Sequence, residues 1–242
     1  MELLTKQPLS FICYILWFIY HKPERTDLAF TTNPFSYIFR YENKYNITGE
    51  NVWQFDKYIR WFKTNLVIIF EKQYWKDINQ RFDNFRNLNT NQSTNSYDTY
   101  LTLNLKKDDL SYFESIDEEI KQIPSANCPL PKRYRPYNGG LNFGLFKNDQ
   151  MVCFAAAPYI LINSPFSFAI VRGVETKFLK RRQGYALNTV GLLCKELFSQ
   201  YHLKNIFLWV EERNRAARNL YHKIGFSEEV EFSLTYCDLK EE

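Results

Sequence analysis

The amino-acid sequence predicts an α+β protein in two parts, of which the C-terminal part holds a mixed, mostly antiparallel sheet flanked by helices. In some segments apolar residues recur at helical spacing, and in others they alternate with polar residues as in strands. The chain of 242 residues is long enough for two units of roughly 100 to 150 residues each. Residues 88–96 are rich in Asn, Ser and Thr, which is typical of a linker. We therefore expect one domain over 1–96 and another over 97–242.

The first part has the pattern of a smaller α+β domain. Its apolar run from Phe11 to Tyr20 is too short to cross about 30 Å of hydrocarbon as a helix, and no cleavage-site pattern follows it. We interpret this run as a buried helix. We expect helices over 9–20, 52–62 and 73–85 and strands over 28–32, 36–41 and 66–70.

In the second part, an antiparallel meander is followed by alternating helices and strands. Asn148 and Asp149 suit the turn of a hairpin. Asn214 is a ready N-cap, and Gly225 stands where a helix commonly ends in a left-handed residue. We expect strands over 97–105, 141–146, 151–158, 167–176, 206–210 and 230–239, and helices over 108–123, 184–201 and between Asn214 and Gly225.

Composition and charge narrow the classes of function. The net charge of +4 comes without a block of like charges, so we expect no nucleic-acid partner. The 5 cysteines and 3 histidines lack metal-ligand or disulfide spacing, so we expect no metal and a reducing, cytoplasmic location. We also expect no membrane attachment, and both a monomer and a homodimer remain open.

A basic loop between a strand and a long amphipathic helix is the most informative segment. Arg181, Arg182 and Gly184 stand directly before that helix. The first turn of a helix leaves four N–H groups unpaired and carries a partial positive charge, and glycine lets an anion approach them. Neither the Walker pattern nor the dinucleotide-binding glycine pattern is present. The segment therefore predicts a phosphate-binding site of another kind.

Two motifs in this part resemble those of the GNAT acetyltransferases. Arg181 to Ala186 reads Arg-Arg-Gln-Gly-Tyr-Ala, which is similar to the family's acyl-CoA loop [RQ]-x-x-G-x-[GA], and the strand motif Val-Glu-Thr of residues 174–176 precedes it. Residues 208–226 look like the family's V-x-x-x-N-x-x-A-x-x-L-Y-x-x-x-G-F. Both motifs occur in the family's order and spacing, and the resemblance covers residues 97–239.

The resemblance implies a GNAT-like fold with acetyl-CoA as cosubstrate and no metal. It also implies that the acetyl group passes directly to a primary amine, of a small molecule or a protein, within a ternary complex. In the family the fourth strand binds the pantetheine arm, and the loop amides hold the pyrophosphate. The residues that would bind the cofactor here are Val174, Thr176, Arg181, Arg182, Gln183, Gly184, Tyr185, Ala186, Asn214 and Ala217.

Two catalytic residues are proposed from the same motifs. A phenol with a reference pKa near 10 is protonated at neutral pH, and the family assigns the protonation of the thiolate leaving group to the tyrosine that is Tyr221 here. Glu175 is our candidate base, although strand alternation points it away from the Val174 and Thr176 side chains. Glu211 and Glu212 are the other candidates.

Several alternatives stay open at this point. The alternative to an enzyme is a catalytically idle acyl-CoA-binding or sensing module, and use of a longer acyl group is a third possibility. The first part shares the order of strands and helices, which permits a degenerate GNAT-like domain, but it lacks a phosphate loop. Cys153 and Cys194 are expected to pack in the core, and His202 and His222 to lie exposed at helix ends.

Overall fold

The computed structural model describes residues 13, 16, 20–21, 26–32, 35–41, 44–48, 66–70, 85–86, 98–110, 119–124, 140–162 and 166–237. The chain divides into two compact units. The first comprises Met1–Leu101, Glu211–Arg213 and Val230–Glu242, and the second comprises Thr102–Val210 and Asn214–Glu229. The predicted linker at 88–96 lies outside the described residues.

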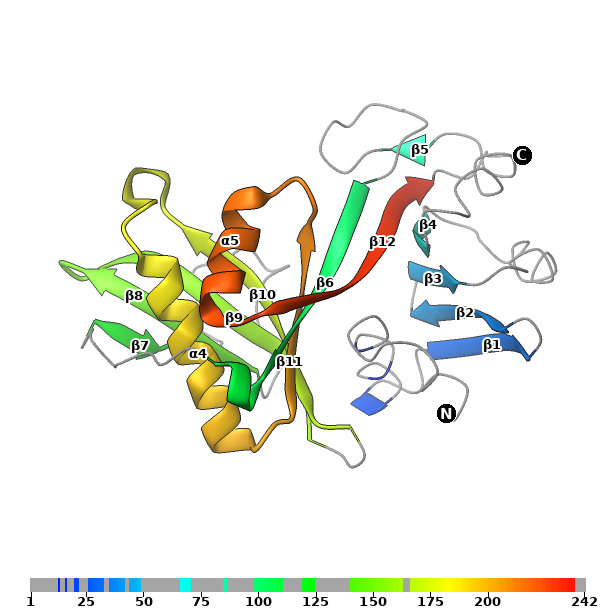
Figure 1. The fold of residues 1–242 in the computed structure, drawn as a ribbon, viewed down its shortest axis with the longest axis horizontal. Helices are drawn as coiled ribbons and strands as arrows, with labels where there is room; N and C mark the ends of the chain where they lie inside the picture. Colours follow the sequence, from blue (N-terminus) through cyan, green and yellow to red (C-terminus); the bar gives the residue numbers. More distant parts are fainter. Residues whose placement is uncertain are drawn as a thin grey trace. The chain divides into compact units, whose positions relative to one another are not determined.

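The first unit contains a three-stranded antiparallel sheet in the order β1–β2–β3 (Figure 1). In addition, β4 and β5 pair antiparallel with the C-terminal part of β12. The strand bounds are β1 (Thr26–Thr32), β2 (Phe35–Tyr41), β3 (Lys44–Thr48), β4 (Leu66–Phe70), β5 (Phe85–Arg86) and β12 (Ser227–Cys237).

Three predicted strands of this unit are present as β1, β2 and β4. Cys13 and Leu16 are helical and buried, as expected of the helix at 9–20. Strand β3 was not predicted, because its polar sequence forms a strand through pairing with β2. Phe85, which we placed at the end of a helix, is in a strand that pairs with β12. The predicted helix at 52–62 and residues 73–84 lie outside the described part of the chain.

The sheet of the second unit runs in the order β6–β11–β10–β9–β8–β7. The pairs β7–β8, β8–β9 and β9–β10 are antiparallel, whereas the pair β10–β11 is parallel. The predicted mixed, mostly antiparallel sheet with flanking helices is therefore confirmed. The strand bounds are β6 (Asp98–Lys106), β7 (Ile120–Gln122), β8 (Leu141–Lys147), β9 (Gln150–Leu161), β10 (Phe168–Thr176) and β11 (Asn205–Glu211).

The helix predicted over 108–123 is wrong where the structure describes it. Lys107–Asp109 forms only a single 3-10 turn, η5, and Ile120–Gln122 is strand β7. Ile120 lies opposite Leu145 of β8, so pairing with an existing strand determined its backbone conformation. A few apolar residues at helical spacing do not distinguish a helix from a short edge strand.

The hairpin between β8 and β9 has the predicted two-residue turn. Asn148 and Asp149 have φ values of 49° and 58°, and their neighbours Lys147 and Gln150 pair across the turn. Two positive φ values are what a tight hairpin of this length requires, and Asn and Asp accept them readily. β9 continues beyond the predicted end at Pro158, because its last residues pair with the start of β10.

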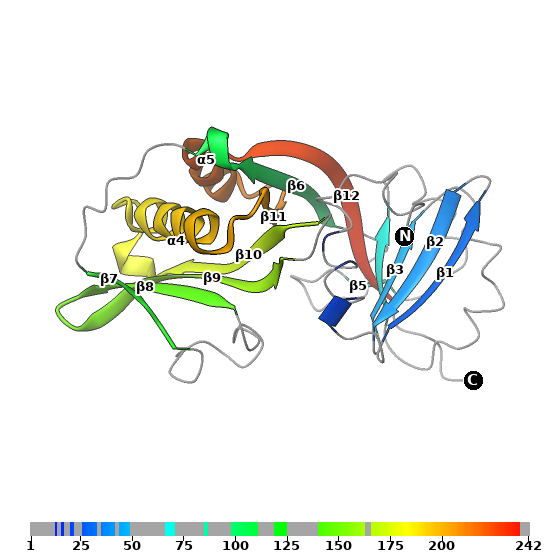
Figure 2. The same ribbon diagram turned by 90° about the horizontal axis from the view of Figure 1, so that it is seen from below.

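Helices α4 (Tyr185–Tyr201) and α5 (Arg215–Ile224) lie on the same side of the second unit's sheet (Figure 2). α4 packs against β8, β9, β10 and α5. The buried face of α4 comprises Thr189, Val190, Gly191, Leu193, Cys194, Leu197 and Phe198. Burial of a side chain such as Leu197 or Phe198 stabilises the fold by roughly 1.5–3 kcal/mol. Both helices have the predicted bounds to within one residue.

Candidate active site

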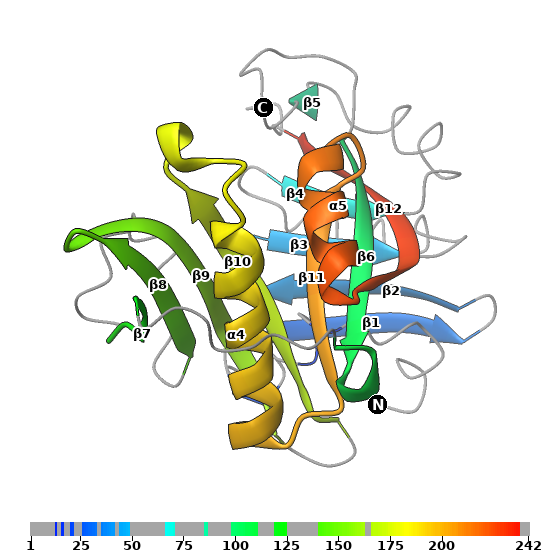
Figure 3. The same ribbon diagram turned by 60° about the vertical axis from the view of Figure 1, so that its left-hand side comes forward.

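The two parallel strands β10 and β11 separate after their first residues. Within the described part of the chain, the paired residues are Phe168, Ala169 and Ile170 of β10 with Asn205, Ile206 and Phe207 of β11. Figure 3 shows the two strands diverging beyond that point. Parallel strands end at the same edge of a sheet, and α4 and α5 follow them in sequence. Both helices therefore begin beside the opening between the strands.

β10 contains a bulge beside this opening. Arg172 pairs with Ala156 and Glu175 with Phe154, so β10 has one more residue than β9 between these two pairs. Gly173, with a φ of 69°, lies within the extra length. Glu175 is exposed whereas Val174 and Thr176 are half-buried, as expected if alternation points the Glu175 side chain away from theirs. Val174, Glu175 and Thr176 all line one pocket.

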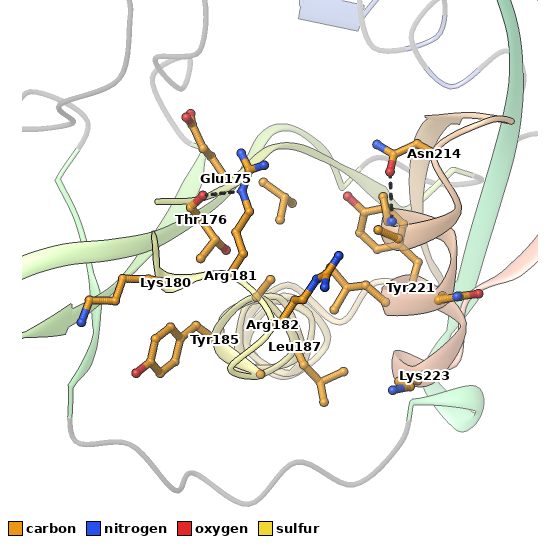
Figure 4. Close-up of a pocket in the computed structure, with 17 residues that line it drawn as sticks. Glu175, Thr176, Lys180, Arg181, Arg182, Tyr185, Leu187, Asn214, Tyr221 and Lys223 are labelled. Carbon is orange, nitrogen blue, oxygen red and sulfur yellow. Dashed lines mark hydrogen bonds between the residues drawn. The ribbon is translucent and has the colours of Figure 1, made fainter. Parts of the chain in front are cut away.

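This pocket has a volume of about 760 Å³ and lies between the end of β10, the start of α4 and one side of α5 (Figure 4). Every predicted site residue except Gln183 lines it. It is lined by Val174, Glu175, Thr176, Lys180, Arg181, Arg182, Gly184, Tyr185, Ala186, Leu187, Asn214, Ala216, Ala217, Asn219, Leu220, Tyr221 and Lys223. Glu211 and Glu212, the other candidate bases, are not among these residues.

Several lining residues were not predicted. They are Lys180, Leu187, Ala216, Asn219, Leu220 and Lys223. The spacing of Ala216, Asn219 and Lys223 marks one stripe of α5, which a helical wheel drawn around the motif would have revealed. Leu187 and Leu220 add apolar side chains to the lining, and each is only partly buried.

The first turn of α4 has the features of an anion-binding site. Gly184 is its N-cap, with a φ of 80°, and no side chain caps the helix. A Cβ atom placed on Gly184 would meet no heavy atom within 4 Å, so the space beside it is open. The Nε of Arg181 donates a hydrogen bond of 3.2 Å to the carbonyl oxygen of Thr176, which ties the loop to the end of β10. A phosphate group can therefore approach the unpaired amides of this turn.

Tyr221 supplies a protonated phenol to the α5 wall. Its ring packs edge-on against Phe226, with centroids 5.8 Å apart, and its side chain is 8% exposed. Burial raises the pKa of Tyr221 to about 12, with a smaller contribution from the charge of Cys194. The hydroxyl is therefore a proton donor at neutral pH and a poor base.

The cysteines and histidines have structural environments. The hydroxyl of Thr176 donates to the sulfur of Cys153 over 3.2 Å, and burial raises the pKa of both Cys153 and Cys194. His222 contacts the carbonyl oxygen of Phe226 at 2.9 Å and lies outside the pocket lining. His202 is exposed at the C-cap of α4. The described residues contain no group of side chains suited to a metal ion and no helix long and apolar enough to cross a membrane.

Comparison with known proteins gives one matching family model and several solved structures of similar fold. Residues 144–234 match the model of the family described as FR47-like protein. Structures of similar fold include a GCN5-related N-acetyltransferase from Kribbella flavida, at 10% identity and a TM-score of 0.57 over 90% of each chain. This part of the chain has a GNAT-like fold, and we refer to it as the GNAT-related domain.

Two further solved structures have a fold similar to that of this chain. A GCN5-related N-acetyltransferase-like protein from Streptococcus suis has 14% identity and a TM-score of 0.52 over 89% of each chain. An acetyltransferase of the GNAT family from Colwellia psychrerythraea has 12% identity and a TM-score of 0.51, over 97% of this chain and 98% of its own. Comparison with curated proteins gave no match. At these identities the likeness is one of fold.

Proposed function

We propose that the GNAT-related domain is an N-acetyltransferase that moves the acetyl group of acetyl-CoA directly to a primary amine. The observation that carries this proposal is the single pocket that joins the uncapped start of α4 at Gly184 to the buried phenol of Tyr221. The start of α4 offers backbone amides to a diphosphate, and Tyr221 offers a proton to a leaving group. A cosubstrate with a phosphate at one end and a thioester at the other fits both.

In the proposed complex, the diphosphate of acetyl-CoA lies against the amides of residues 181–186. The pantetheine arm follows the free edge of β10 at Val174 and Thr176, where β11 has separated from it. Asn214 stands across the pocket, at the start of α5.

The reaction needs one base and one acid. The neutral amine attacks the thioester carbonyl, and the tetrahedral intermediate then collapses to an amide and the CoA thiolate. Tyr221, which its raised pKa keeps protonated at neutral pH, donates its proton to that sulfur. Glu175, the one carboxylate among the lining residues of the described chain, accepts the proton that the amine loses. Direct transfer is favoured because Cys153 is buried and hydrogen-bonded to Thr176.

A second candidate is an acyl-CoA-binding module without catalysis. It is favoured by the exposure of Glu175, because an exposed carboxylate is a weaker candidate base than a desolvated one. Release of free CoA thiol from acetyl-CoA, measured with a panel of small and peptide amines, separates the two. Amine-dependent release supports the enzyme, whereas binding without release under every amine supports the module. Acyl-CoA compounds with longer chains in the same assay test whether the pocket accepts a larger acyl group.

We also propose that residues 1–96 belong to a second, smaller domain that does not bind CoA. This part has no counterpart of the Arg181 to Ala186 loop. The alignment over 90% of the chain with the protein from Kribbella flavida is compatible with a degenerate GNAT-like half. Calorimetric titration should give one CoA per chain, and two equivalents would contradict this proposal. A cytoplasmic location and a monomer or homodimer remain expectations that fractionation and light scattering would test.

A further inference from the structure

The pocket carries more positive charge than a diphosphate needs. Its lining includes four cationic side chains, Lys180, Arg181, Arg182 and Lys223, and one carboxylate, Glu175. The diphosphate of CoA links two groups and bears about two negative charges. Coenzyme A has a third phosphate, a monoester on the 3′-hydroxyl of its ribose, and such a group carries about −1.5 to −2 at pH 7. The excess charge of the pocket fits this group.

None of these four cations forms an ion pair within the part of the chain that the structure describes. Arg181 donates to the carbonyl oxygen of Thr176, and the side chain of Lys180 extends away from α5 (Figure 4). Arg182, which lies between α4 and α5, and Lys223 of α5 are the two that remain. Elsewhere Arg213 pairs with Glu211 at 3.0 Å and Arg218 with Glu228 at 2.7 Å. Carboxylates therefore satisfy other surface arginines of the chain, whereas Arg182 and Lys223 remain available to an anion.

The backbone of Arg182 adds a second observation. Its φ is 63°, in the left-handed region that a non-glycine residue occupies only at a cost of roughly 1–3 kcal/mol. Such strain persists where a residue must aim its side chain at a ligand. Figure 4 shows the guanidinium of Arg182 in the middle of the pocket, between the start of α4 and α5.

Figure 4 also separates the two ends of the pocket. Glu175, Thr176 and Asn214 lie at one end, and Leu187 and Lys223 lie at the other. In the proposed complex the thioester arm occupies the first end and the diphosphate lies near the centre. The remaining part of the cofactor, its phosphorylated adenosine, then has to leave past the second end. Lys223 is the cation at that exit, whereas the side chain of Lys180 extends away from α5.

We propose that Lys223, assisted by Arg182, binds the 3′-phosphate of CoA and makes the domain prefer CoA over 3′-dephospho-CoA. This inference rests on the proposed function. A lysine ammonium suits the task because it is a flexible point charge with three donors. Lys223 lies in the last turn of α5, where the helix dipole favours a cation. This structural role alone would give no preference for CoA over 3′-dephospho-CoA, so the preference distinguishes it from phosphate binding.

The test compares the affinities of CoA and 3′-dephospho-CoA by calorimetry in low-salt buffer. We expect the unmodified protein to bind CoA about threefold to tenfold more tightly, because a contact with an exposed lysine is screened by water. In Lys223→Ala this preference should fall to less than about twofold through weaker CoA binding alone. Lys223→Arg should keep it. The matched control Lys195→Ala removes an exposed lysine of α4 outside the pocket lining and should leave both affinities unchanged.

Three results would overturn the inference. The first is equal affinity of the unmodified protein for both ligands, which leaves the proposed function intact. The second is a loss of both affinities in equal measure in Lys223→Ala, because that would place the lysine at the diphosphate. The third is loss of the preference in Lys180→Ala but not in Lys223→Ala. Failure of the unmodified protein to bind either ligand would overturn both this inference and the proposed function.

Discussion

The backbone amide of Ala217 donates a hydrogen bond of 3.1 Å to the side-chain oxygen of Asn214. This contact caps α5, and Asn214 also lines the pocket. One side chain therefore begins a helix and faces the proposed cofactor. Its amide nitrogen is not engaged by the cap, so the two roles use different atoms of the same group and can be separated by substitution.

Substitution of Asn214 should separate capping from cofactor binding. Asn214→Ala removes both roles and should lower the free energy of unfolding by about 1 kcal/mol. Asn214→Ser retains an oxygen that caps well, so stability should stay close to that of the unmodified protein, while the amide donor is lost. Urea unfolding and acetyl-CoA titration measure the two effects. Unchanged acetyl-CoA affinity in Asn214→Ser would remove Asn214 from the cofactor site.

Substitution of Gly184 should affect binding more than folding. Its positive φ costs an added side chain roughly 1–2 kcal/mol, but the open space beside it leaves no further clash. Gly184→Val should therefore fold and lose measurable CoA affinity, because its side chain fills the approach to the helix amides.

Gly225→Ala is the matched comparison for Gly184→Val. It also has a positive φ, but its Cβ would overlap the carbonyl oxygen of Asp109, so it should destabilise the fold more and impair CoA binding less directly. Thermal unfolding with and without CoA checks both variants. A Gly184→Val protein that is stabilised by CoA as strongly as the unmodified protein would contradict the phosphate site.

Tyr221→Phe should spare acetyl-CoA affinity and lower kcat by about 100-fold, because it removes the acid and keeps the ring that packs on Phe226. Amine-dependent release of CoA thiol gives kcat, and calorimetry gives the affinity. An equal loss of affinity and turnover would assign Tyr221 to packing alone.

The raised pKa of Tyr221 predicts a loss of stability at high pH. Burial favours the neutral phenol, so below pH 10 the hydroxyl is protonated in both the folded and unfolded states and its stabilising contribution is complete. Above the unfolded pKa near 10 the unfolded state loses this proton first, so stability falls until the folded group titrates at about 12. The loss is about 3 kcal/mol, because the pKa rises from near 10 to about 12 on folding. Urea unfolding at pH 9, 10 and 11 should show a steeper decline than in Tyr221→Phe, and identical declines would contradict the shift.

Glu175→Gln should lower kcat/KM by about 100-fold and flatten the acidic limb of its pH profile if Glu175 is the base. Glu212→Gln is the comparison, because Glu212 was an alternative base and does not line the pocket. It should leave the profile unchanged. A normal profile in Glu175→Gln would indicate that the amine loses its proton to water or to another group.

In the second unit, the sequence predicted features that depend on adjacent residues more reliably than features that depend on pairing between strands. The cap at Asn214, the end of α5 at Gly225 and the turn at Asn148 and Asp149 each depend on neighbouring residues, and each is present. Strand β7 and the bulge at Gly173 depend on a neighbouring strand, and both escaped prediction. The site depends on both kinds of feature. Its motif residues were predicted, whereas the contribution of Lys223 to the pocket lining was not.

The sequence by itself determined the basic loop at 181–186, the helices α4 and α5 that follow it and most of the strands around them, because hydrophobic period, caps and glycine positions act over a few residues. Only the tertiary structure decided that β10 and β11 separate after three paired residues and that β10 carries a bulge at Gly173. Strand separation and register depend on hydrogen bonds between segments distant in the chain. A pattern read along one segment carries no information about its partner, and the pocket exists only where the two strands part.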